Sequence, residues 1–151
     1  MTDAIDETFF SIYHSFLNIY VLLDDGDRHA LQAASLTPSQ YNLLSRLENE
    51  TVGLTITDLA NHLLCTRGNI TRMVQRLEKH ELIQIAKDAD DQRRLRITLT
   101  PAGKAAYEAA NNAHITSLRQ RFAALSSTEQ QQLFDLLQKV TTMLEANLSQ
   151  D

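Results

Sequence analysis

The chain has 151 residues, of which 43% are hydrophobic and 22% charged, as expected for one globular domain with a modest core. Four glycines and two prolines are too few for a loop-rich or all-β protein, and no apolar run of about 20 residues would cross a membrane. The acidic start MTDAIDETFF does not resemble a secretory signal, and one cysteine, Cys65, allows no internal disulfide, so we expect a cytoplasmic protein.

The net charge of −5 is unevenly distributed along the chain. Between Thr66 and Lys104 there are nine basic and five acidic residues, which gives this stretch a charge of +4 and leaves −9 elsewhere. A polyanion such as DNA binds a local positive face whatever the total charge. The alternative is a solvated helix face that happens to be basic, and charge alone does not decide between the two.

The first predicted element is a helix over residues 5–23, where apolar residues recur at steps of four and three. Aromatic and apolar neighbours at Phe10, Tyr13, Leu17 and Tyr20 widen this surface. The run of residues 24–27, Asp-Asp-Gly-Asp, interrupts the pattern and predicts a kink or short break; it lacks the spacing of a calcium loop. The seam comprises Ile5, Phe9, Ile12, Phe16, Ile19 and Leu23.

Four further helix starts are indicated by capping residues. Thr37-Pro38-Ser39-Gln40 and Ser126-Ser127-Thr128-Glu129 have the order of a capping box, while Thr55 and Thr100 each precede a helical pattern. The last helix has a second apolar seam, formed by Leu133, Leu137, Val140, Leu144 and Leu148. Two short strand patterns, 82–86 and 95–99, flank a polar stretch that predicts an exposed hairpin tip.

Residues 56–77 read as a helix-turn-helix motif. Thr66 is placed to cap the second helix, Ala60 allows close approach, and Leu64 occupies a turn position that is often glycine. The expected interior residues are Leu59, Leu63, Cys65, Ile70 and Met73. The outer side presents residue types that contact phosphates or base edges, namely Arg67, Asn69, Thr71, Arg72, Gln75 and Arg76. The alternative is a pair of packed helices with an ordinary polar surface.

A hairpin with a basic tip directly after a helix-turn-helix indicates a winged helix, and the motifs also resemble a known family. Asp91-Gln92-Arg93 followed by Leu99-Thr100-Pro101-Ala102-Gly103 is similar to the D-x-R-x5-L-T-x-x-G pattern of MarR-family regulators. The segment 66–78 resembles the recognition helix of that family, and 37–41 resembles the start of its second helix. The fold class expected is mainly α with a small β-hairpin wing.

The resemblance implies a homodimer in which residues 1–35 and 101–151 form the dimerisation helices and 36–100 the winged-helix DNA-binding region. It implies that Arg93 enters the minor groove and that Asp91 orients it. A narrow, electronegative minor groove attracts a guanidinium group, although Asp91 and Arg93 could also be an ordinary exposed pair. The expected DNA-binding residues are Thr66, Arg67, Gly68, Asn69, Thr71, Arg72, Gln75, Arg76, Asp91, Arg93 and Arg94.

The family resemblance also implies a small-molecule effector, often an aromatic acid, and repression through a pseudo-palindromic operator. Side chains that could line an effector pocket are Phe16, Tyr20, Ser39, Tyr41 and Ser45, although such an aromatic stripe also suits a core or a dimer interface. The five histidines lack a two-histidine ligand spacing, and Cys65 suits packing better than redox sensing. We expect no metal, cofactor or enzymatic activity; the remaining alternative is a winged-helix module for protein contacts.

Overall fold

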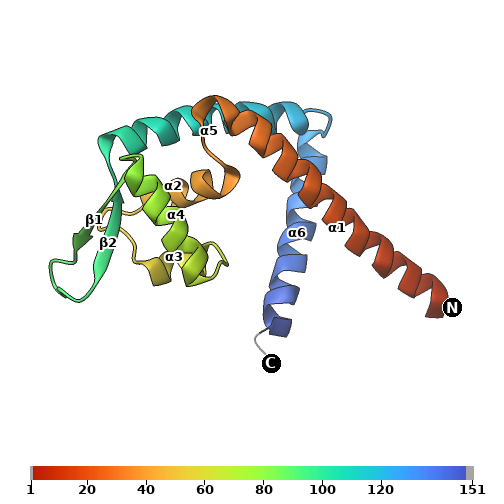
Figure 1. Cartoon of the computed structure of the whole chain (residues 1–151). Coiled ribbons are helices and arrows are strands. Elements are labelled where there is room, and N and C mark those ends of the chain that lie inside the picture. The colour runs from red at the N-terminus through yellow and green to blue at the C-terminus, as the bar shows by residue number, and fades with distance from the viewer. Residues whose placement is uncertain (1, 149–151) are drawn as a thin grey trace. The chain divides into compact units, whose positions relative to one another are not determined.

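The computed structural model describes residues 2–148, with side chains from residue 6 onward, and it is mainly helical with one hairpin (Figure 1). This confirms the expected fold class. The helices are α1 (Thr2–Leu31), the short 3-10 helix η1 (Gln32–Ala34), α2 (Pro38–Glu48), α3 (Ile56–His62), α4 (Arg67–Lys79), α5 (Pro101–Arg121) and α6 (Ser127–Leu148). The hairpin consists of β1 (Ile83–Lys87) and β2 (Leu95–Leu99). The chain forms two compact units, one extending to Ser117 and one beginning at Leu118.

The predicted helix starts are confirmed because each depends on a local side chain. The Thr37 hydroxyl accepts from the Gln40 N–H at 3.2 Å, and the Gln40 side chain accepts from the Thr37 N–H at 2.9 Å. Thr55 forms the same reciprocal arrangement with Asp58, and Ser126 forms it with Glu129. These bonds satisfy main-chain donors that the first turn of a helix leaves unpaired.

The predicted break at residues 24–27 is wrong, because α1 continues through them to Leu31. Two of the acids that suggested a bend instead form pairs one helical turn apart on the helix surface. Arg28 contacts the Asp24 carboxylate at 2.7 Å, and His29 Nδ1 lies 3.6 Å from the Asp25 carboxylate. Side chains at positions i and i+4 are neighbours on a helix, so acids followed by basic groups support the helical turn.

The first unit has a continuous apolar core in which the second helix of the motif is anchored. Ile70, Val74 and Leu77 lie on the inner face of α4, and Ile83 and Ile97 extend the core into the hairpin. Leu59 and Ala60 are buried beneath them, as predicted, while Leu63 and Met73 are half-buried. The contacts of the inner face of α4 with the core therefore determine which way its outer face points.

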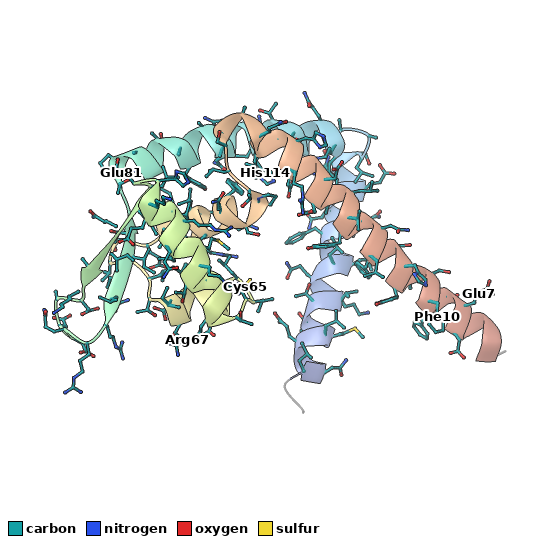
Figure 2. The ribbon with its side chains drawn as sticks, in the orientation of Figure 1. Glu7, Phe10, Cys65, Arg67, Glu81 and His114 are labelled. Carbon is teal, nitrogen blue, oxygen red and sulfur yellow. The ribbon has the colours of Figure 1, made fainter. Side chains whose placement is uncertain are left out.

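The turn between α3 and α4 departs from the sequence prediction at Cys65, which is exposed and not interior. Leu64, in the position often taken by glycine, adopts a left-handed conformation with φ of 51° and is 95% exposed. The Cys65 N–H donates to the Ala60 carbonyl oxygen at 3.0 Å, and its side chain is left on the surface at the start of α4 (Figure 2). Val74 of α4, which was not among the expected interior residues, is buried in the core.

The hairpin is antiparallel, with Ile83 opposite Leu99 and Ile85 opposite Ile97. Strand β1 begins and ends one residue later than predicted, and β2 has the predicted bounds. Leu54 exchanges two main-chain hydrogen bonds with Ile97, at 3.1 and 2.9 Å. The preceding Gly53 has φ of +80°, and a Cβ there would lie 2.6 Å from the Ile97 carbonyl oxygen. Glycine at this position allows the loop before α3 to approach β2.

The start of α5 is held against the junction between α4 and β1. The Thr100 hydroxyl donates to the Glu81 carbonyl oxygen at 2.6 Å and accepts from the Gly103 N–H at 2.9 Å. The Thr100 N–H donates to the Leu82 carbonyl oxygen at 3.1 Å. A Cβ on Gly103 would lie only 1.8 Å from that oxygen, so no larger residue fits without main-chain movement.

The second unit contains the end of α5 and all of α6. The Leu118 carbonyl accepts from the Phe122 N–H at 3.0 Å, and the capping box of Ser126 begins α6. None of the α6 side chains is buried. The predicted seam residues Leu133, Leu137, Leu144 and Leu148 are exposed, which leaves an apolar helix face uncovered in the single chain.

Gly103→Ala should lower the free energy of unfolding by roughly 2–3 kcal/mol, because overpacking forces the main chain of Leu82 to move. Gly68→Ala is the matched control, since a Cβ at Gly68 meets no atom within 4 Å and alanine favours the helix. Urea unfolding of both variants measures the difference. Equal stability of the two variants would contradict the close approach of α5 to Leu82.

Candidate nucleic-acid interface

The exposed face of α4 and its N-cap contain the eight residues of this segment that the sequence predicted to bind DNA. The Thr66 hydroxyl accepts from the Asn69 N–H at 3.3 Å, so the helix begins as expected and its first polar residues project outward. The exposed set is Thr66, Arg67, Gly68, Asn69, Thr71, Arg72, Gln75 and Arg76. Arginine, asparagine and glutamine on one helix face can hydrogen-bond guanine and adenine edges or phosphates.

Two of these side chains are already ordered against each other. Arg72 donates from Nη2 to Asn69 Oδ1 at 2.9 Å, and its Nε lies 3.4 Å from the Gly68 carbonyl oxygen. The Thr71 hydroxyl donates to the Arg67 carbonyl oxygen at 2.8 Å. Holding a guanidinium in one direction before DNA arrives reduces the entropy lost on binding.

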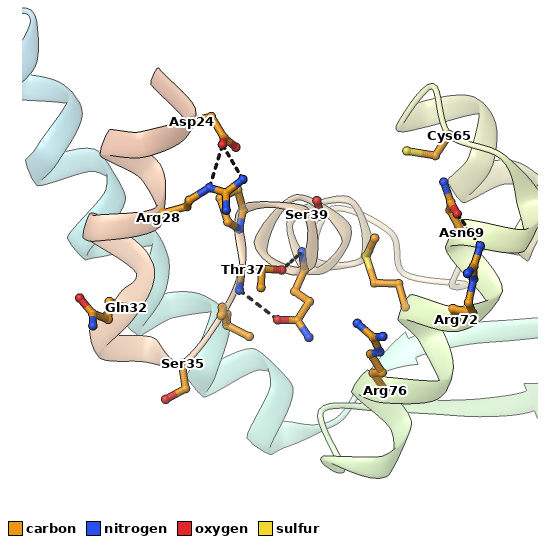
Figure 3. Close-up of a pocket in the computed structure, with 14 residues that line it drawn as sticks. Asp24, Arg28, Gln32, Ser35, Thr37, Ser39, Cys65, Asn69, Arg72 and Arg76 are labelled. Atoms are coloured by element: carbon orange, nitrogen blue, oxygen red, sulfur yellow. Dashed lines mark hydrogen bonds and ion pairs between the residues drawn. The ribbon is translucent and has the colours of Figure 1, made fainter. Parts of the chain in front are cut away.

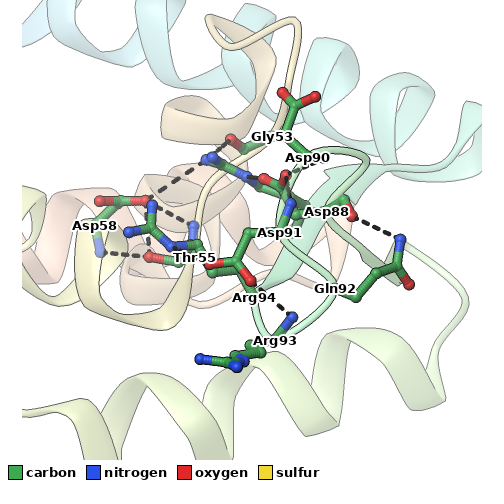
Figure 4. A network of polar contacts seen from close by, with 10 residues as sticks. Gly53, Thr55, Asp58, Asp88, Asp90, Asp91, Gln92, Arg93 and Arg94 are labelled. Carbon is green, nitrogen blue, oxygen red and sulfur yellow. Dashed lines mark hydrogen bonds and ion pairs between the residues drawn. The ribbon is translucent and has the colours of Figure 1, made fainter.

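The predicted DNA-binding residues of the hairpin tip lie on the surface, but the Asp91 carboxylate contacts the guanidinium of Arg94 and not that of Arg93. Asp91 Oδ1 accepts from the main-chain N–H of Arg93 at 3.0 Å, and Asp91 Oδ2 lies 3.4 Å from Nε of Arg94 (Figure 4). Asp91 thus orders the main chain at Arg93 and contacts the guanidinium of its neighbour. The Arg93 side chain is exposed.

The two predicted DNA-reading elements share one surface depression of about 470 Å³. Arg67 from the start of α4 lines it together with Arg93 and Arg94 from the hairpin tip. Thr55 and Asp58, from the start of α3, form part of the same wall. Three arginines around one depression create a local positive potential of the kind that attracts a phosphate backbone.

The sequence prediction missed the polar contacts at the base of the hairpin. Arg96 Nε donates to the Asp88 carboxylate, Arg96 Nη1 lies 3.2 Å from the Gly53 carbonyl oxygen, and Asp88 is only 7% exposed. The Arg96 guanidinium and the N–H groups of Asp90 and Asp91 lower the pKa of Asp88 to about 2. Arg96 alternates with apolar residues along β2, but two of its three partners, Gly53 and Asp58, belong to a segment distant in sequence.

A larger cavity of about 750 Å³ lies where the end of α1, the start of α2 and α4 meet (Figure 3). Its polar walls include Arg28, Arg72 and Arg76, and Leu36, Pro38 and Met73 contribute apolar surface. Ser39 is the one predicted effector residue that lines this cavity.

The other four predicted effector residues lie elsewhere. Phe16 and Tyr20 are exposed on α1, and Ser45 is half-buried in α2. Tyr41 is buried; its hydroxyl donates to Asn111 Oδ1 at 2.8 Å, and burial raises the pKa of the phenol. The structure therefore does not bring the five residues into one cavity.

Metal-ligating side chains show no cluster in the described part of the chain. Within residues 6–148, no three histidine, cysteine or carboxylate side chains lie close enough to hold one ion. His114 Nε2 lies 3.1 Å from Asp27 Oδ1, and the ring of Tyr41 is 4.9 Å from that of His114. This group links α1, α2 and α5 within the first unit.

A helix-turn-helix whose exposed second helix is followed by an arginine-bearing hairpin defines a winged-helix DNA-binding protein. The model of the MarR family matches residues 36–95. The homoprotocatechuate degradative operon repressor of Escherichia coli is 30% identical over 112 residues, which cover 74% of this chain and 75% of the repressor. The chain belongs to the MarR family of transcription regulators.

Two further relatives agree with this assignment. The transcriptional activatory protein BadR of Rhodopseudomonas palustris is 32% identical over 81 residues, which cover 52% of this chain but less than half, 46%, of BadR. MepR of S. aureus, solved as a complex with DNA, superposes with a TM-score of 0.80 and 26% identity over 87% of this chain and 96% of MepR. No helix within residues 2–148 combines the length and apolar character needed to cross a membrane.

The lowered pKa of Asp88 predicts a specific pH dependence of stability. A carboxyl whose folded pKa is about 2 stabilises the fold at pH values above its unfolded pKa, and this contribution is lost as the pH falls toward 2. Asp88→Asn should therefore destabilise the protein at pH 7 and cost progressively less between about pH 4 and pH 2. Urea unfolding at several pH values measures this, with Asp90→Asn correcting for the lost charge. A stability difference unchanged down to pH 2 would contradict the prediction.

Proposed function

We propose that this regulator binds a pseudo-palindromic operator as a homodimer and represses transcription until a small aromatic acid releases it. In this proposal α4 enters the major groove and the hairpin tip, or wing, enters the adjacent minor groove. The supporting observation is the depression that Arg67 shares with Arg93 and Arg94, because it joins the two elements on one cationic surface. Such a regulator needs no catalytic residues and acts where the DNA is, in the cytoplasm.

The homodimer is supported by apolar side chains that the single chain leaves exposed. On α1, Phe9, Ile12 and Ile19 are exposed, Ile12 to 48%, and on α6 Leu144 is 58% exposed. Obligate interfaces commonly bury about 2,000 Å² or more of largely apolar surface. We assign residues 1–35 and 101–151 to dimerisation and 36–100 to DNA binding. Ile5, the first seam residue, lies outside the residues whose side chains the structure describes.

Selection of bound sequences from a random duplex pool tests the main proposal. A two-fold symmetric dimer should recover an inverted repeat with half-sites about one helical turn, roughly 10 bp, apart. Sedimentation at micromolar concentration should show a dimer without DNA. A folded monomer, or recovery of an asymmetric single site, would contradict the proposal. Retention of no sequence above background would favour the alternative of a winged-helix protein-interaction module.

Arg72→Ala and Arg93→Ala should weaken binding to the selected duplex in different ways. Each contact with a base edge or a compressed groove contributes about 1–3 kcal/mol. Arg72→Ala should reduce discrimination against a scrambled duplex. Arg93→Ala should weaken binding while most half-site preference remains, because the minor-groove pattern is degenerate.

Lys139→Ala, exposed on α6 and not one of its apolar seam residues, is the control for a lost positive charge outside α4 and the wing. Titrations at fixed salt distinguish the three variants, and all three should remain dimeric. If Arg93→Ala bound both duplexes as the Lys139→Ala control does, the proposed role of the wing would be rejected.

The effector is supported by the cavity of about 750 Å³, a size that suits a small ligand. Within residues 6–148, the structure contains no ion pair involving Arg76, and Arg72 contacts only neutral groups in its own helix. A carboxylate could bind these two guanidinium groups while an aromatic ring contacts Leu36 and Met73. The other predicted effector contacts lie outside this cavity and stay a prediction; they are Phe16, Tyr20, Tyr41 and Ser45.

Aromatic acids should release the protein from its selected duplex, because Arg72 and Arg76 line the cavity and also belong to the proposed DNA-binding face. Homoprotocatechuate and benzoate are suitable probes, with benzyl alcohol as the uncharged control of similar shape. Fluorescence anisotropy of the labelled duplex should fall with either acid and stay constant with the alcohol. Equal release by the acid and the alcohol, or by neither, would argue against a carboxylate site in this cavity.

A further inference from the structure

One charged residue, Asp88, is buried in the part of the chain whose side chains the structure describes, and it lies at the start of the wing tip. It follows β1 directly, and its N–H donates to the Arg94 carbonyl oxygen at 2.9 Å, so it closes the hairpin ladder. Its carboxylate binds Arg96 of β2. A buried ion pair by itself is weak evidence for a role in stability, because desolvation offsets much of the attraction.

Arg96 connects the wing to the helix-turn-helix through oxygens of three residues in two segments. Besides the Asp88 carboxylate, its Nη1 binds the Gly53 carbonyl oxygen at 3.2 Å and lies 3.9 Å from Asp58 Oδ2. Asp58 belongs to the capping box of α3, which packs against α4. One guanidinium therefore joins the base of the wing to the element that supports the recognition helix.

Asp88 then orders the tip itself. Its Oδ1 accepts from the N–H groups of Asp90 and Asp91, at 2.9 and 3.0 Å, and its carbonyl oxygen lies 3.2 Å from Gln92 Nε2. Asp91 in turn accepts from the main-chain N–H of Arg93 at 3.0 Å. A continuous series of contacts thus runs from Arg96 through Asp88 and Asp91 to the main chain of Arg93.

We propose that Asp88 and Arg96 are positioning residues, which fix the wing relative to α4 so that Arg93 meets the minor groove while α4 occupies the major groove. This inference rests on the proposed DNA-binding function. A two-stranded hairpin is marginally stable alone, and a loose tip would lose conformational entropy on binding. The network makes that ordering part of folding, so it is complete before DNA arrives.

The experiment measures binding of full-length variants to the duplex recovered by selection and to a scrambled duplex of the same composition. Asp88→Asn keeps an oxygen acceptor for the tip N–H groups but removes the ion pair with Arg96. Arg96→Lys keeps the charge but loses the fork that reaches several oxygens at once. Asp90→Asn is the matched control: it removes the same charge from the same tip, and no hydrogen bond to its carboxylate is found within residues 6–148.

Asp88→Asn should weaken binding to the selected duplex about 5- to 20-fold, which is a smaller loss than that expected for Arg93→Ala. Arg96→Lys should weaken binding less than Asp88→Asn does. Asp90→Asn should bind as well as the parent or better, since it removes a negative charge near DNA. In an Arg93→Ala background, Asp88→Asn should add less than about a twofold loss, because the two residues act as a unit. A merely structural role would weaken binding equally in both backgrounds.

The outcomes separate this inference from the proposed function. If the parent protein does not prefer the selected duplex, the proposed function fails before any variant is compared. If the parent prefers it and Arg93→Ala weakens binding, but Asp88→Asn matches Asp90→Asn, the positioning role is overturned. It is also overturned by additive losses in the double variant, or if circular dichroism shows both Asp88→Asn and Arg96→Lys to be unfolded at the assay temperature.

Discussion

The pair of main-chain hydrogen bonds between Leu54 and Ile97 joins the two halves of the DNA-binding unit. It fixes the position of β2 relative to the loop that precedes α3. It requires glycine at position 53 because the two main chains approach so closely. The core residues Ile83 and Ile97 then continue the apolar surface of α4 into the hairpin. Apart from the glycine at position 53, a main-chain joint of this kind depends little on side-chain identity, so the exposed residues around it are free to serve binding.

The elements that the sequence predicts well are those determined by neighbours within one or two turns. Thr37, Thr55, Thr66 and Ser126 cap helices because a hydroxyl three residues before a main-chain N–H can reach it in any tertiary context. The alternation of apolar residues in 95–99 likewise defines β2 without knowledge of its partner. The exposed face of α4 is predicted in the same way, because the helical period of its buried residues Ile70, Val74 and Leu77 determines which residues lie on the opposite side.

The features that the sequence predicts poorly depend on partners far along the chain. The ion pair of Asp88 and Arg96 joins residues eight apart, but its second and third acceptors come from the segment 53–58. Cys65 occupies an interior position of the helix-turn-helix pattern, yet it follows the left-handed turn at Leu64 and its side chain is exposed. The predicted effector residue Tyr41 likewise has a distant partner, because its hydroxyl donates to Asn111, seventy residues away.

The uneven charge of the chain has a consequence for how the protein finds its target. The stretch that contains α4 and the wing is positive, and the remainder is strongly negative. In the proposed function, DNA would attract the positive stretch and repel the acidic remainder, so encounters in the wrong orientation would be short-lived. The acidic residues, none of which needs to touch a base, would then lower the affinity for arbitrary DNA and shorten the search for the operator.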